Sequence, residues 1–196
     1  MAYLARQERR AAILEAAVSI AIKEGLAAAT VRRVAQAIDA AAGQIHHHFD
    51  SASELRAEAF ATLTRRSLED KSQDHKDKNA TTRLLALLGY SDTAADLQEN
   101  NLWNEAILIS QHDEAMKSAL AENINTWHRE IVAILEATQT GNASERCISA
   151  DDSAWRLIGL SNGLYGLMQL ETLGFTKEAF NHNMLCAIES ELLIGR

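Results

Sequence analysis

The chain has 196 residues, no proline, only 5% aromatic residues and a formal charge of −8. Alanine is abundant, and because alanine is the best helix former and proline the worst, this composition favours an all-α fold. The N-terminal residues carry charge where a signal peptide would be apolar, and no apolar run is long enough to span a bilayer, so no membrane association and a cytoplasmic location are expected. Cys147 and Cys186 lie far apart without metal-ligand spacing, which is typical of reduced, structural cysteines.

The charge is unevenly distributed along the chain. Residues 1–56 hold seven Lys/Arg and six Asp/Glu, whereas the remainder holds 12 and 21. The whole-chain charge argues against a nucleic-acid ligand. The N-terminal quarter, however, is near neutral with its arginines grouped at two places, which is compatible with DNA contact.

Four helices are predicted in the N-terminal third from apolar residues at helical spacing and from capping residues. Gly25 stands where a C-terminal capping glycine belongs, and Thr30 is a good N-cap. Asp39 interrupts the next apolar stripe. Ser51 and Glu54 form a capping box. The predicted helices span residues 5–24, 31–37, 41–47 and 52–69.

The rest of the chain is also predicted to be helical. Residues 70–80 are dense in charged and amide side chains, which indicates a frayed helix end and a linker. Residues 138–149 are predicted to form a polar loop. Helices are predicted over residues 82–95 and 102–111, from Asp113 to the polar loop, from Asp151 or Asp152 to 173, and over 177–193, giving about nine helices in all.

Three short helices within about 45 residues, followed by a capped fourth, form a helix-turn-helix arrangement. The second and third helices must cross steeply so that the third can enter a major groove about 12 Å wide. Val34, Ala35, Ile38 and Ile45 provide the small apolar side chains that this crossing needs.

Residues 9–55 resemble the DNA-binding domain of the TetR family of transcriptional repressors. The segments that follow the family pattern in order and spacing are Ile13–Ala17, Gly25, Thr30–Ala35, Gly43–Phe49 and Ser53–Leu55. The resemblance implies a helix-turn-helix domain over residues 1–50 and a helical ligand-binding and dimerisation domain over residues 51–196. It implies a homodimeric regulator of transcription, not an enzyme, whose small-molecule inducer releases it from operator DNA.

The chain departs from the family pattern at three positions. Asp39 replaces the usual glycine of the turn, and aspartate tolerates left-handed backbone geometry better than most residues. His46 replaces a tyrosine that often contacts phosphate, and a histidine can still donate a hydrogen bond to phosphate. Ala52 replaces a lysine, so one phosphate contact fewer is expected.

The resemblance also implies which residues contact DNA. Gln44 is the long polar side chain on the expected reading surface, where it can bond adenine, and small Ala42 and Gly43 permit close approach. The remaining residues are expected to meet the phosphate backbone or to flank it, and on the first helix either Arg9 or Arg10 is expected to make this contact, the other being an ordinary solvated charge. The full predicted set is Arg10, Thr30, Arg32, Arg33, Ala42, Gly43, Gln44, His46, His47, Ser51 and Ser53.

A ligand cavity is predicted in the C-terminal part from aromatic and methionine residues with polar residues among them, although a single aromatic or methionine residue at helical spacing is more often plain core. Gly159, Gly163 and Gly166 share one side of a helix, which indicates close helix approach or admission of a ligand. The last two long helices are predicted to form an isologous dimer interface. The predicted ligand-binding residues are Trp103, Met116, Trp127, His128, Asn162, Tyr165, Met168 and Gln169.

Two other classes of protein remain as alternatives: a helical adaptor that binds protein, and an all-helical enzyme. The sequence offers no convincing catalytic triad, glycine-rich phosphate loop or di-carboxylate motif, so no catalytic residue and no cofactor are predicted. Neighbouring residues on a helix point about 100° apart, so the run His46–His48 is not predicted to bind a metal. A second set, His112 and His128 with Asp113 or Glu130, is expected to be solvated or pocket-lining.

Overall fold

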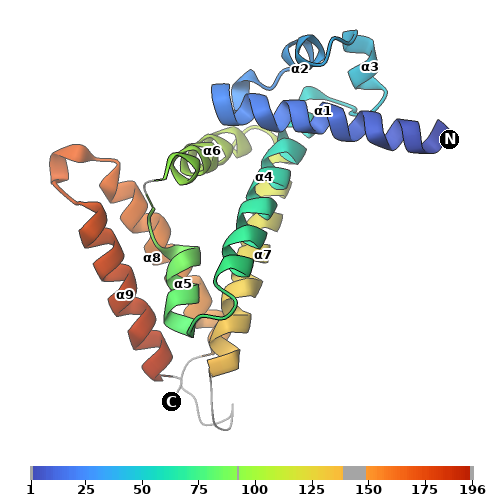
Figure 1. Cartoon of the computed structure of the whole chain (residues 1–196). Coiled ribbons are helices and arrows are strands. Elements are labelled where there is room, and N and C mark those ends of the chain that lie inside the picture. The colour runs from blue at the N-terminus through green and yellow to red at the C-terminus, as the bar shows by residue number, and fades with distance from the viewer. Residues whose placement is uncertain (1, 92, 139–148, 195–196) are drawn as a thin grey trace. The chain divides into compact units, whose positions relative to one another are not determined.

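A computed structural model describes residues 2–91, 93–138 and 149–194 (Figure 1). Within these ranges it contains α-helices, two short 3-10 helices and no strand, which confirms the predicted all-α fold. The α-helices are α1 (Ala2–Glu24), α2 (Val31–Ala37), α3 (Ala42–His46), α4 (Ala52–Asp74), α5 (Ala80–Leu88), α6 (Ala94–Ser110), α7 (Glu114–Thr138), α8 (Ala150–Met168) and α9 (Lys177–Ile194). None of the described helices is long and apolar enough to cross a membrane.

Several helix boundaries differ from the prediction because local caps override the apolar pattern. Gly89 ends α5, and Thr93 starts a new helix by accepting a hydrogen bond from the backbone of Asp96 at 3.2 Å. Two helices are present here as predicted, but the predicted end at residue 95 and the predicted start at residue 102 are wrong. The helix predicted to end at residue 69 continues to Asp74. The predicted loop over residues 138–149 lies almost wholly outside the described residues.

The last two helices are also bounded by caps. Ser149, not Asp151 or Asp152, caps α8 by accepting a hydrogen bond from the backbone of Asp152 at 3.0 Å. The helix ends at Met168 and is followed by a 3-10 turn, so the predicted end at residue 173 is wrong. Thr176 caps α9 by accepting a hydrogen bond from the backbone of Ala179 at 3.3 Å.

The chain divides into two compact units, which we call unit 1 (described residues within 1–66 and 93–123) and unit 2 (described residues within 67–91 and 124–194). This division by packing differs from the predicted functional domains 1–50 and 51–196, which remain a prediction. The physical reason is an apolar cluster that joins Leu26 to α4, α6 and α7 through Phe60, Leu102 and Met116, all of which are buried.

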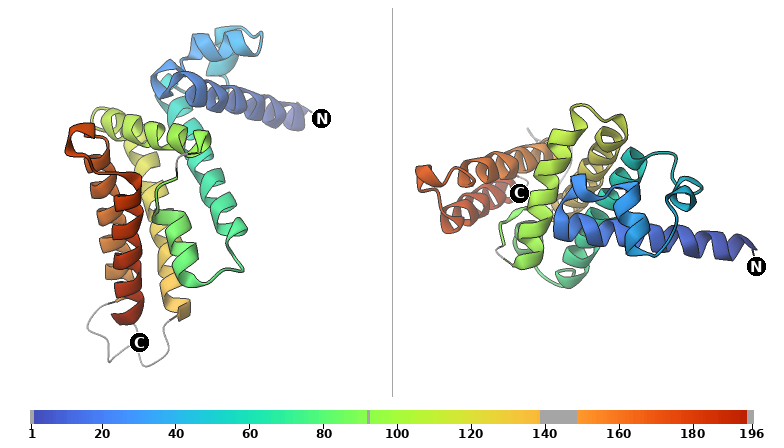
Figure 2. Two further views of the ribbon diagram at one scale, coloured as in Figure 1. Left: turned by 60° about the vertical axis from the view of Figure 1, so that its left-hand side comes forward. Right: turned by 90° about the horizontal axis from the view of Figure 1, so that it is seen from above.

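Unit 2 has its own apolar core. In it α5, α8 and α9 pack side by side, and the C-terminal half of α7 contributes Ile131, Ile134 and Leu135 (Figure 2). Phe180 and Met184 of α9 are among its buried residues, at 2% and 0% exposure.

Candidate nucleic-acid interface

The helix-turn-helix is formed by α2 and α3, which lie on one side of α1 (Figure 1). Thr30 begins α2 by accepting a hydrogen bond from the backbone of Arg33 at 3.2 Å. The turn after α2 passes through Asp39, whose φ of 49° is left-handed, and the backbone N–H of Ala40 donates to Ala35 at 2.9 Å. The prediction that Asp39 can take the place of glycine is confirmed, since an aspartate adopts this conformation at small cost.

Helix α3 is held by one buried side chain. Ile45 is fully buried against the apolar cluster that contains Val34 and Phe49. The other residues of the helix, Ala42, Gly43, Gln44 and His46, are exposed, as is His47 after it. The predicted reading residues therefore share the outward side of α3.

Gly43 has an informative environment. A methyl group added to it would meet nothing within 4 Å, and its φ is not left-handed. The packing of the protein itself therefore does not require glycine at this position. A glycine here permits the backbone to approach an external partner closely.

Basic residues gather around the end of α3. Burial is the main cause that lowers the pKa of His48, and the neighbouring charges of Arg6, His47, Arg10 and Arg9 lower it further. The contact of the Arg10 guanidinium with the Phe49 ring likewise places this part of α1 close to the residues after α3. Arg9, which is exposed, was expected as an alternative to Arg10. Arg6, also exposed, was missed, although its helical spacing from Arg9 was a signal that could have found it.

Arg10 is engaged within the protein. It forms an ion pair with Glu58 of α4, and its guanidinium lies 4.5 Å from the centre of the Phe49 ring. A guanidinium over an aromatic face is stabilised by the quadrupole of the ring. Arg10 thus connects α1 to α4 and to the residues that follow α3. The contact of Arg10 with phosphate remains a prediction.

The arginines of α2 differ from one another. Arg33 makes a two-pronged contact with Glu24 at 2.6 and 3.2 Å, and this hydrogen bonding lowers the pKa of Glu24 and raises that of Arg33. Arg32 is exposed. Arg33 can bind phosphate only if it gives up its contact with Glu24, which makes the exposed Arg32 the more accessible of the two arginines.

The start of α4 carries the predicted capping box. Ser51 accepts a hydrogen bond from the backbone of Glu54 at 3.0 Å, and the Glu54 carboxylate accepts one from the backbone of Asp50 at 2.5 Å. Ser53, predicted to lie near phosphate, donates its hydroxyl to Asp113 of α7 at 2.5 Å.

A second polar contact holds the turn between α1 and α2. The Glu105 carboxylate of α6 accepts a hydrogen bond from the backbone of Leu26 at 2.6 Å. Gly25 has a φ of 90°, and a methyl group there would come within 2.8 Å of the Glu105 carboxylate. Gly25 is therefore required both by its backbone conformation and by the space that this carboxylate occupies.

The predicted ligand-binding residues are divided between the two units. Trp103 and Met116 belong to the apolar cluster of unit 1, where the Trp103 ring meets the edge of Phe60 at 5.2 Å. In unit 2, Trp127, Tyr165 and Met168 pack against the core, while Asn162 and Gln169 are exposed on α8. Their assignment to a ligand remains a prediction.

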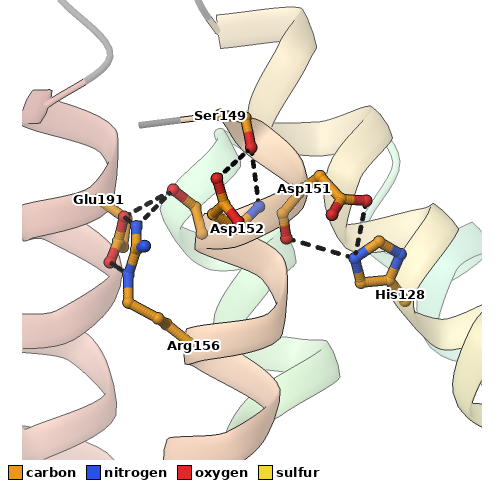
Figure 3. A network of polar contacts seen from close by, with 7 residues as sticks. His128, Ser149, Asp151, Asp152, Arg156 and Glu191 are labelled. Carbon is orange, nitrogen blue, oxygen red and sulfur yellow. Dashed lines mark hydrogen bonds and ion pairs between the residues drawn. The ribbon is translucent and has the colours of Figure 1, made fainter. Parts of the chain in front are cut away.

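His128 belongs to α7 and lies beside the first turn of α8 in unit 2 (Figure 3). Its Nε2 atom is 3.3 Å from the backbone oxygen of Asp151 and 3.4 Å from the carboxylate of that residue, and its ring stacks on Trp155 at 4.2 Å. Nearby, Glu191 accepts hydrogen bonds from Arg156 and Ser153. These contacts explain His128 as a buried residue that fixes the first turn of α8.

Unit 1 also contains a cavity of about 320 Å³ between the end of α1 and α6. Glu24, Gly25, Asn101 and Glu105 are among its lining residues, and none of the predicted ligand-binding residues lines it. Among the described residues, no three His, Cys, Asp or Glu side chains are grouped so as to hold a metal ion.

The fold and this surface define a helix-turn-helix protein with a helical C-terminal part. The family model described as "Bacterial regulatory proteins, tetR family" matches residues 13–59, and the model described as "BetI-type transcriptional repressor, C-terminal" matches residues 80–193. The chain therefore belongs to the TetR family of bacterial transcriptional regulators, and the predicted resemblance is confirmed. A comparison with curated proteins found no match.

Solved structures of similar fold cover nearly the whole chain. A TetR-family transcriptional regulator from Rhodococcus sp. is 22% identical with a TM-score of 0.73, over 95% of this chain and 99% of that one. A transcriptional regulator from Saccharomonospora viridis in complex with choline is 19% identical with a TM-score of 0.69, over 93% and 96%. The multidrug binding protein EbrR complexed with imidazole is 21% identical with a TM-score of 0.63, over 92% and 89%. These relatives are regulators and binding proteins, not enzymes.

Proposed function

We propose that this regulator is a repressor that binds a specific operator as a homodimer and leaves it when a small molecule binds the C-terminal domain. The observation that carries the DNA-binding part is the outward side of α3. It presents Ala42, Gly43 and Gln44 to solvent, and Ile45 anchors the helix from the other side. A short helix presented in this way can enter a major groove and read base edges.

Phosphate contact is proposed for the exposed basic and capping residues that surround α3. Arg6 and Arg9 join the predicted set because they lie near His48, and Arg32 is exposed on α2. Phosphate contacts position a protein on DNA, while base contacts give it specificity. Gln44 is therefore proposed as the main base-reading side chain.

Dimerisation is proposed through the exposed side of α8 together with α9. A methyl group on Gly159, Gly163 or Gly166 would meet nothing within 4 Å, so the fold of a single chain does not require these glycines. Trp155 and Leu167 on the same helix are each 44% exposed, which is unusual for large apolar side chains unless they have a partner. A second copy of the chain, packed helix against helix, would cover them.

The inducer is proposed to be an organic cation. Among similar structures, one regulator holds choline, and EbrR holds proflavin in one structure and imidazole in another. In the present chain the aromatic rings of Tyr90 and Tyr165 lie 6.2 Å apart in unit 2, and cations bind well to aromatic faces. Calorimetry with choline, against its uncharged carbon isostere as the control, tests this charge requirement directly.

Selection of bound genomic fragments by the wild-type protein, followed by gel shifts at several salt concentrations, tests the proposal as a whole. A sequence-specific regulator enriches one motif with twofold symmetry, and its affinity falls with salt in proportion to the phosphates neutralised. Gln44→Ala should relax specificity at one base pair by about 1–3 kcal/mol. Enrichment of no motif would overturn the proposed function, and capture of a protein instead would favour an adaptor.

A further inference from the structure

The Asp113 carboxylate lies at the N-terminus of α7 and serves two helices at once. Its Oδ1 atom accepts hydrogen bonds from the backbone of Met116 at 2.9 Å and from the Ser53 hydroxyl at 2.5 Å. Its Oδ2 atom lies 3.5 Å from a guanidinium nitrogen of Arg56. The bond to Met116 alone would cap α7. The contacts with Ser53 and Arg56 reach across to the first turns of α4.

This cluster is largely removed from solvent and stays charged. The Asp113 and Arg56 side chains are 13% and 22% exposed. The hydrogen bond from Ser53 is the largest cause that lowers the pKa of Asp113, while partial burial opposes it. A hydrogen bond to an ionised carboxylate is stronger than one between neutral groups, so the Ser53 contact holds α4 firmly.

The contact limits what Ser53 can do on DNA. A serine hydroxyl has one hydrogen to donate, and here that hydrogen is directed at Asp113. It cannot at the same time donate to a phosphate oxygen. The first backbone N–H groups of α4 have no partner within the helix, because no residue precedes them at the required spacing. The N–H of Glu54 already donates to Ser51, so the amides of Ala52 and Ser53, and not the Ser53 hydroxyl, are the groups that can meet phosphate.

We propose that Asp113 is a positioning residue for operator binding, which holds the first turn of α4 through Ser53 so that the amides of that turn meet phosphate. The same turn is joined to α3 in two ways. The Glu54 carboxylate accepts a hydrogen bond from the backbone of Asp50, and Leu55 shares one apolar cluster with Phe49 and with Ile45 of α3. The inference rests on the proposed function and deepens it. It replaces a direct role of Ser53 on DNA by an indirect role of Asp113.

A double-mutant cycle on DNA affinity tests the inference. The variants are Ser53→Ala, which removes the hydroxyl, Asp113→Ser, which keeps an oxygen to cap α7 but is too short to reach Ser53, and the two combined. The probe is the duplex that the wild-type protein selects from genomic fragments. Binding is measured at several salt concentrations and below the unfolding midpoint of every variant. Asp113→Asn keeps one acceptor oxygen for Met116 and Ser53 but replaces the second oxygen by an NH2 donor and removes the charge, and it serves as the conservative control.

Each single variant is expected to weaken operator binding by at least about tenfold, the effect of losing one hydrogen bond to a charged group. The double variant should bind the operator no more weakly than the weaker-binding of the two single variants. Asp113→Asn should bind more tightly than Asp113→Ser. The dependence of affinity on salt should be the same in every variant as in the wild type. A purely structural role would lower the unfolding midpoints without this coupling in affinity.

Two results would overturn the inference: effects that multiply in the double variant, or unchanged affinity in both single variants. The first would restore Ser53 as a direct phosphate contact. Failure of the wild-type protein to select any duplex would instead reject the proposed function, so the two failures are distinguishable.

Discussion

Helices α3 and α8 both present glycine to solvent, but they are held in place very differently. α3 has five residues, of which only Ile45 is buried, whereas α8 has nineteen residues, of which seven are buried. A methyl group on Gly43 or on Gly163 would meet nothing within 4 Å in either helix. The glycines alone therefore do not indicate what each surface binds. The binding partner of each surface has to be inferred from the residues around the glycines.

Those neighbours differ in chemistry. Around the end of α3 lie the cationic side chains of Arg6, Arg9 and Arg10, which suit a polyanion. The outward side of α8 is flanked by Trp155 and Leu167, which suit another apolar surface. The comparison predicts that substitutions in α3 will act on DNA binding within one subunit, and substitutions in α8 will act through assembly.

The most damaging single change should be Ile45→Ala. Removing a fully buried isoleucine costs about 3 kcal/mol of unfolding free energy, and α3 has no second anchor to compensate. Denaturant unfolding of the variant checks this value. Gln44→Ala, one residue away but exposed, is the matched control and should change stability by no more than about 0.5 kcal/mol.

Gly163→Leu should disrupt assembly without harming the fold of the subunit. The added side chain finds open space in one chain but would block close approach of a second helix. Analytical ultracentrifugation should report a shift from dimer to monomer. Operator affinity should fall about a hundredfold, because the two DNA-binding domains no longer bind the two half-sites as one linked unit. A variant that remains a dimer of unchanged affinity would place the interface elsewhere. Gly174→Ala, outside α8, is an unsuitable control because its φ of 63° strains any other residue.

Arg9→Ala should weaken DNA binding evenly across sequences. If Arg9 neutralises one phosphate, the slope of log affinity against log salt becomes shallower by about one. Gel shifts on the operator and on an unrelated duplex measure both slopes. Glu8→Ala, at the exposed neighbouring position, should not make the slope shallower. A change in specificity at a single base pair would contradict a pure phosphate contact.

The smallest expected effect concerns the ion pair that joins α8 and α9. Arg156 holds the pKa of Glu191 below its ordinary value of 4.5, so the pair stabilises unit 2 above that pH and the benefit is lost as pH falls. Because Arg156 is partly exposed, Glu191→Gln should cost less than about 1 kcal/mol at neutral pH. The difference in unfolding free energy between wild type and variant should shrink in acid, and a constant difference would contradict the assignment.

The N-terminal part of the fold was predictable because it is specified by local signals. Thr30, Asp39 and the capping box from Ser51 to Glu54 each fix the backbone over a few residues, and the structure places them as expected. The outward position of Ala42, Gly43 and Gln44 follows from the same short-range logic, since Ile45 alone has to be buried.

What could not be predicted depends on contacts distant in sequence. Ser53 and Asp113 are 60 positions apart in the sequence, and Leu26 and Glu105 are 79 positions apart. No local sequence pattern predicts either contact. The break between α5 and α6 was missed although local signals mark it. Gly89 and Ser91 interrupt the apolar pattern there, and Thr93, which accepts a hydrogen bond from the backbone of Asp96, marks where the new helix begins.

The contact between Leu26 and Glu105 has a consequence for biosynthesis. Chains emerge from the ribosome N-terminus first. Leu26, in the turn after α1, is therefore synthesised long before Glu105, whose carboxylate accepts the hydrogen bond from the Leu26 backbone. Leu26 and Phe60 likewise wait for Leu102 and Met116 before they can be covered. A nascent or truncated chain that stops at residue 66 would leave apolar surface bare, so the first helices of this protein complete their folding only after half of the chain has been translated.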